Sequence, residues 1–104
     1  MIDNQIAYNE QIGVFSATDA YFGTAHLVGS AKQNNHGRWS WKGHLGDPSF
    51  DLRILAGRGE IRIEFSDGAV GRAFCELKHR IRPGSSRTYA TLIGNGKPPR
   101  VEEH

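Results

Sequence analysis

Two stretches of alternating apolar and polar residues near the middle of the chain constrain its fold most. They span residues 50–54 (FDLRI) and 60–65 (EIRIEF). Because successive side chains of a strand point to opposite faces of a sheet, each stretch predicts a strand with one apolar and one solvated face. A Ser-Asp-Gly turn and a third predicted strand over 69–77 follow. This part of the chain therefore predicts an antiparallel meander.

Three further strands are predicted over 20–28, 38–45 and 88–93, separated by segments rich in glycine, proline and asparagine. With 104 residues, 13 glycines and 38% hydrophobic residues, the chain suits one small sheet domain better than a helical bundle. Such strands either stack as two sheets or close into a barrel, and closure removes exposed edges. We predict an all-β fold, a small antiparallel β-barrel of six to seven strands.

The predicted organisation has three parts. Residues 1–19 are expected to form a flexible N-terminal arm or lid, because their apolar positions follow neither the helical nor the strand period. Residues 20–97 form the barrel domain, and residues 98–104 form a C-terminal tail. The basic segment 78–87 is expected to be a loop.

Bulky and very small residues are predicted to face each other inside the barrel. Alternation places Trp39 and Trp41 on the inner face of one strand, while small residues recur at inner positions elsewhere, namely Gly23, Ala25, Gly43, Gly71 and Ala73. Either the indoles fill the space beside the small residues, or a pocket for an apolar organic ligand remains at one mouth. The predicted ligand-binding residues are Trp39, Trp41, Phe65, Phe74 and Tyr89.

Acid–base chemistry, if the pocket performs any, is assigned to Tyr21, His44 and Glu64, which lie close to aromatic strands where burial shifts a pKa. Alternation points His44 and Glu64 outward, so only a bulge or an open barrel end brings them to a pocket. With no nucleophile motif present, the reaction class favoured is a cofactor-free cyclisation or isomerisation, in which the site holds a reactive conformer of the substrate.

Other chemistries are disfavoured by the sequence. The five histidines lack the ligand spacing of zinc sites, so no metal is predicted, and Cys75 is interpreted as a buried hydrophobe. A net charge of +2 is small for a nucleic-acid protein, and Trp39 and Trp41 face away from Arg38 and Lys42. Neither a leader nor a long apolar run opens the chain, and one cysteine allows no internal disulfide. A cytoplasmic protein that binds neither membrane nor nucleic acid is expected.

Three motifs resemble an actinobacterial family of unknown function, whose members occur alone or attached to the C-terminus of flavin-containing monooxygenases. The motifs are Tyr-x-Gly-x-Ala at 21–25, Gly-x-Trp-x-Trp-x-Gly at 37–43 and Gly-x-Gly-x-Pro-Pro at 94–99, with a first interval shorter than the family's. The resemblance implies a setting in bacterial specialised metabolism and transfers no catalytic residue. It also implies that any flavin or nicotinamide belongs to a partner chain, so no cofactor is assigned here.

Two functions follow from these observations. The first is binding of an apolar small molecule, with or without cyclase or isomerase activity. The alternative is a non-catalytic interaction module that docks on a flavin-containing monooxygenase or pairs with a second copy as a homodimer.

Overall fold

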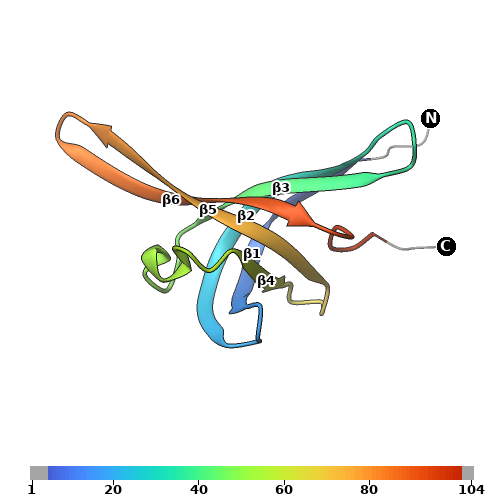
Figure 1. Cartoon of the computed structure of the whole chain (residues 1–104), viewed down its shortest axis with the longest axis horizontal. Helices are drawn as coiled ribbons and strands as arrows, with labels where there is room; N and C mark the ends of the chain where they lie inside the picture. Colours follow the sequence, from blue (N-terminus) through green and yellow to red (C-terminus); the bar gives the residue numbers. More distant parts are fainter. Residues whose placement is uncertain (1–4, 102–104) are drawn as a thin grey trace.

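Six antiparallel strands close into a barrel in the computed structural model (Figure 1). The structure describes residues 5–101, apart from the side chains of 80–82 and 85–87. The elements are β1 (Gln5–Ser16), β2 (Tyr21–Gln33), β3 (Trp39–Gly46), the 3₁₀ helix η1 (Leu52–Leu55), β4 (Glu60–Glu64), β5 (Val70–Arg82) and β6 (Ser85–Asn95). Around the barrel the order is β1-β2-β3-β6-β5-β4, which confirms the predicted all-β barrel.

The barrel consists of two three-stranded halves. Strands β1, β2 and β3 form one meander, and β4, β5 and β6 form the other. The halves meet along two short seams: β1 pairs with β4 from Gly13↔Glu64 to Ser16↔Ile61, and β3 pairs with β6 from Lys42↔Ile93 to Leu45↔Ala90. Each seam contains four residue pairs, so parts of β1 and β3 extend beyond the opposite half.

The core lies inside the barrel and follows the predicted alternation. Along β3 every second residue is buried or partly buried, and along β4 Ile61 and Ile63 are fully buried. Val14, Leu27 and Leu92 enter the same core from three other strands. Burying such side chains contributes roughly 1.5–3 kcal/mol each, which makes the inner face the main source of stability.

Residues 5–16, predicted as part of a flexible arm, instead form β1, the strand that closes the barrel. Tyr8, Ile12 and Val14 are buried on its inner face. Glu10 occupies the inner-face position between Tyr8 and Ile12 and is only partly buried, so a charged residue breaks the apolar alternation that would have identified the strand. The rest of the predicted arm includes residues 1–4, which lie outside the described residues.

The predicted C-terminal tail is also part of the core as far as residue 101. Pro98, Pro99 and Val101 are buried, and the Tyr8 hydroxyl donates a 2.6 Å hydrogen bond to the Pro99 carbonyl oxygen. Residues 102–104 lie outside the described residues. The segment 96–101 therefore packs against β1.

The predicted strand over 50–54 is a loop followed by η1. Asp51 caps the 3₁₀ turn, its side chain accepting from the backbone N–H of Arg53 at 2.9 Å. The turn buries Leu52 and Leu55, three residues apart, and leaves Ile54 exposed. The apolar residues at 50, 52 and 54 follow the two-residue period of a strand, which made the prediction wrong. The three-residue spacing of Leu52 and Leu55 fits a 3₁₀ helix.

The segment 78–87, predicted as a basic loop, extends two strands instead. Strands β5 and β6 continue to Arg82 and from Ser85, joined at Pro83 and Gly84, where Gly84 has a φ of 84°. Proline followed by a positive-φ glycine suits a type II turn. The resulting ribbon projects from the barrel (orange in Figure 1).

Among residues 5–101 no helix is long and apolar enough to span a bilayer.

Candidate functional site

The space beside Gly71 and Gly94 is occupied by Trp41. Its side chain is 3% exposed and lies over Gly94, where an added Cβ would overlap the indole. A Cβ on Gly71 would lie 3.1 Å from Trp41 Cζ2 and 2.5 Å from Pro99 Cγ. Tyr8 packs edge-on against the indole at 6.2 Å between ring centroids. At this end of the barrel the ring of Trp41 fills the volume that the glycines leave.

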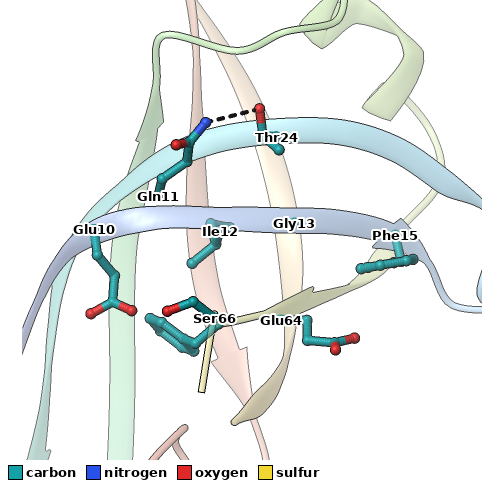
Figure 2. A pocket seen from close by; sticks show the side chains of 9 residues that line it. Glu10, Gln11, Ile12, Gly13, Phe15, Thr24, Glu64 and Ser66 are labelled. Carbon is teal, nitrogen blue, oxygen red and sulfur yellow. Dashed lines mark hydrogen bonds between the residues drawn. The ribbon is translucent and has the colours of Figure 1, made fainter. Parts of the chain in front are cut away.

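A cleft opens where the β1–β4 seam ends (Figure 2). It encloses about 520 Å³ and is called the β1–β4 cleft here. Strand β1 extends on the N-terminal side of Gly13 while β4 ends at Glu64, so the two chain segments diverge and leave the space between them. The lining residues are Glu10, Gln11, Ile12, Gly13, Phe15, Thr24, Glu64, Phe65 and Ser66.

One wall of the cleft is the Phe15 ring, which is covered by an arginine. The Arg62 guanidinium lies 4.2 Å from the ring centroid, and Tyr21 packs on the same ring at 5.2 Å. Arg62 Nη1 donates to Glu64 Oε2 at 3.0 Å. Its Nε lies 2.8 Å from Asp19 Oδ1 in an ion pair that lacks the alignment of a hydrogen bond. The carboxylates on both sides hold the guanidinium in place over Phe15.

On the other side of the cleft lies Phe65, a core residue that is 3% exposed and whose ring is covered by Arg100 from the C-terminal segment. The guanidinium lies 4.4 Å from the ring centroid. Nη1 and Nη2 of Arg100 donate to the two Glu10 carboxylate oxygens at 2.7 and 2.6 Å, and Nε donates to Asp67 Oδ2 at 2.9 Å. This double pairing raises the pKa of Arg100, and the Ala69 N–H together with Arg100 lowers the pKa of Asp67.

The cleft combines apolar walls with hydrogen-bond acceptors. Phe15 supplies apolar surface together with the nearly buried Ile12 and Phe65, and the carboxylates of Glu10 and Glu64 lie on either side of Ser66 (Figure 2). Gln11 Nε2 donates to Thr24 Oγ1 at 3.2 Å at the rim. Because each carboxylate is paired with an arginine, the cleft suits a neutral organic molecule that carries hydroxyl or amine donors.

The predicted site residues fall into separate places. Glu64 and Phe65 line the β1–β4 cleft, and Tyr21, which is 61% exposed, borders it through Phe15. His44 is exposed on β3, with Nδ1 3.4 Å from Thr91 Oγ1 and its ring 6.4 Å from that of half-buried Tyr89. The three acid–base candidates are therefore not assembled around one pocket.

The remaining predicted ligand-binding residues do not line this cleft. Trp39 is half-buried at the start of β3, Trp41 lies in the core, and Phe74 is 48% exposed on the outer face of β5. Conversely, Glu10 and Phe15 line the cleft but fell in the predicted arm, and Arg100 fell in the predicted tail. The apolar residues of β1 and the Pro-Pro-Arg sequence at 98–100 were the available signals.

Metal and thiol chemistry find no assembled site in the described part of the chain. No group of three or more histidine, cysteine, aspartate or glutamate side chains is arranged to hold an ion among these residues. His26 instead contacts Asn9 Oδ1 through Nε2 at 2.5 Å. Burial raises the pKa of the half-buried Cys75 thiol to about 11, which disfavours the reactive thiolate.

No protein-family model, curated protein or solved structure matches this chain. The family resemblance drawn from the three motifs stays a prediction.

Proposed function

We propose that this barrel is a cytoplasmic binding protein that takes an apolar organic molecule with hydroxyl or amine donors in the β1–β4 cleft. The observation that carries the proposal is a cleft of about 520 Å³ in which an apolar lining, with Phe15 as its more exposed ring, occurs together with two carboxylates. Small-molecule sites commonly have volumes of about 300–1,000 Å³ and combine apolar walls with a few polar groups. The lone, half-buried thiol of Cys75 is consistent with a reducing compartment.

The two arginines support binding by fixing the walls in advance. Arg62 and Arg100 pack over the rings of Phe15 and Phe65, and each arginine is held by two carboxylates. A wall that is already ordered loses little side-chain entropy when a ligand arrives. The cleft is thus prepared for a planar or alicyclic body, while Glu10 and Glu64 accept from its donors.

Cofactor-free cyclisation or isomerisation is a finer proposal for the same cleft. Glu64 lines it and Tyr21 borders it, so these two residues are the candidates to exchange a proton with a bound substrate. His44 belongs to β3 and takes no part in this version of the mechanism. Holding a reactive conformer between the phenylalanine rings supplies the remaining rate enhancement.

Binding is tested by titrating the ¹⁵N-labelled protein with 2-naphthol and, as a probe without a donor, naphthalene. We expect saturable amide shifts at 10–13 and 64–66, with 2-naphthol binding about tenfold more tightly because a hydrogen bond to a carboxylate contributes ~1.5 kcal/mol. Glu64→Gln should weaken 2-naphthol and leave naphthalene unchanged.

A blocking variant provides the matched control. Ser66→Trp places an indole in the opening and should abolish the shifts, whereas Asn35→Trp, in the exposed turn between β2 and β3 and outside the cleft, should preserve them. Shifts scattered over the whole surface, or equal binding by both tryptophan variants, would refute the proposal.

The second candidate function is a docking module for a flavin-containing monooxygenase. It is favoured by Phe74 and Ile93, which face each other across β5 and β6 and are 48% and 53% exposed. Beside them, β5 and β6 continue as a two-stranded ribbon past the residues that pair with β4 and β3. The sequence of this ribbon is basic. Like-charged ribbons repel each other, so this surface suits an acidic partner better than a second copy of the chain.

A further inference from the structure

A second groove lies on the outer surface where the β3–β6 seam ends. It encloses about 400 Å³ and is called the β3–β6 groove here. The ladder stops at Lys42↔Ile93, and the next residues along, Trp41 and Gly94, meet through the indole instead of through backbone pairing. The lining residues are Ser30, Lys32, Ser40, Trp41, Lys42 and Ile93.

The groove is positively charged. In the β2–β3 ladder Ser30 is opposite Lys42 and Lys32 is opposite Ser40, so two ammonium groups and two hydroxyls alternate on the same outer face. Neither lysine forms an ion pair with any described residue. Two exposed ammonium groups that pair with no carboxylate of the described residues attract an anion.

The carboxylate of Glu60, on the same row of paired residues as Lys42, is already engaged. In this row Lys42 is opposite Ile93, Ile93 is opposite Phe74, and Phe74 is opposite Glu60, two strands from the groove's edge. Glu60 accepts from Arg72 Nη1 at 3.0 Å and from Asn95 Nδ2 at 2.8 Å, and these bonds lower its pKa. It therefore does not neutralise the lysines.

An unpartnered donor lies at the same seam. Trp41 forms part of the groove wall, is buried with only 3% of its surface exposed, and its Nε1–H has no hydrogen-bond partner among the described residues. A buried donor without a partner costs roughly 1–3 kcal/mol. Because Trp41 lines the groove, the resonance of its indole N–H reports on a molecule that binds there.

The far side of the groove is apolar. Ile93 is 53% exposed, and Phe74 lies directly across from it on β5. A ligand anchored at the lysines thus has an apolar surface to lie on. We propose that the β3–β6 groove binds an organic carboxylate, its carboxylate between Lys32 and Lys42 and its apolar body over Ile93. This site is separate from the β1–β4 cleft and does not depend on it.

The experiment follows the tryptophan side-chain signals of the ¹⁵N-labelled protein during titration with 4-phenylbutyrate. Trp39→Phe assigns the two indole resonances. We expect saturable shifts of the Trp41 indole N–H and of the amides of Lys42 and Ile93. The neutral analogue 4-phenylbutanol should bind about tenfold more weakly, and added salt should weaken the acid but not the alcohol.

Charge-removing variants decide between this groove and general attraction to a basic protein. Lys32→Ala with Lys42→Ala should weaken 4-phenylbutyrate about tenfold, while Lys78→Ala, an exposed lysine on β5, should leave its affinity unchanged. All three positions are exposed, so the fold is retained. Equal affinity for acid and alcohol, an unmoved Trp41 signal, or shifts confined to 10–13 and 64–66 would overturn the proposal. A short peptide that ends in phenylalanine tests whether the groove prefers a peptide C-terminus to a free organic acid. The proposal requires 4-phenylbutyrate to bind at least as tightly as this peptide.

Discussion

Trp41 depends on two glycines that leave room for its indole. Gly94 lies under the ring, and Gly71 lies beside it next to Pro99. Protein interiors are close-packed, so a side chain at either position forces the ring or the backbone to move. The glycines are needed here for space, since neither has a left-handed φ.

Gly94→Ala should therefore destabilise the protein by about 1–3 kcal/mol, the usual cost of overpacking a core. The matched control is Gly46→Ala, because a Cβ there has its nearest neighbour, the His26 carbonyl oxygen, at 3.9 Å. Urea unfolding of the three proteins measures the difference. A Gly94→Ala protein as stable as Gly46→Ala would show that the ring is not held as described.

Individual inner residues could be predicted from the sequence because alternation depends only on strand geometry. It correctly placed Trp41, Ile61 and Ile63 inside. It could not show that Trp41 would lie over Gly94, since that contact joins residues from strands whose pairing the sequence does not reveal. The sequence alone therefore left open whether the space beside the glycines is a cavity or is filled by an indole.

At the scale of elements, the C-terminal segment 96–101 acts as a clasp between the two halves of the barrel. It contacts β1 through Tyr8 and Glu10, and the turn after β4 through Asp67 and Phe65. Burial raises the pKa of Tyr8 to about 12, so its hydroxyl remains a donor to Pro99 well into alkaline solution. Within this segment, Arg100 contacts both halves.

Arg100→Ala should cost about 1–2 kcal/mol in the free energy of unfolding, because it removes a bidentate carboxylate pair and a guanidinium–ring contact together. Arg53→Ala is the control: Arg53 pairs with Asp51 in an exposed local contact, and its loss should leave the free energy of unfolding nearly unchanged because solvent screens such pairs. High salt should reduce the difference in the free energy of unfolding between Arg100→Ala and Arg53→Ala, because it screens the ion pairs of Arg100. Identical unfolding midpoints would mean that the clasp contributes nothing.

Elements with uninterrupted alternation were predicted, and those where a charge or a short helix intervenes were not. Strand β4 was recognised within one residue. Strand β1 was missed because Glu10 occupies an inner-face position, which its pairing with Arg100 from the other end of the chain makes tolerable. Much of the β1–β4 cleft was missed for the same reason, since its residues come from β1.

For the whole molecule, both candidate sites lie where the two halves separate. The β1–β4 cleft and the β3–β6 groove each begin at the last residue pair of a seam. Between them, the outer face of β5 and β6 presents Phe74 and Ile93. If the protein docks on a flavin-containing monooxygenase, this face is the contact that the geometry favours.

That docking is measured by size-exclusion chromatography of the protein mixed with a flavin-containing monooxygenase from the same organism. Co-elution is expected for the unmodified chain and loss of co-elution for Phe74→Ser, because interfaces concentrate their energy in buried aromatic residues. Val28→Ser removes another exposed apolar residue, on β2, a strand that pairs with β1 and β3 rather than with β5 or β6, and should bind as before. Separate elution of the unmodified protein would exclude this partner.

Because backbone pairing joins the two described halves along two short ladders, and the connection over 47–59 contains no strand, this connection can be severed without cutting any strand. The two pieces would each retain a full meander, and reassociation would restore the core from both sides. The molecule therefore suits a split-protein reporter, in which reassembly of the two pieces reports that two proteins fused to them interact.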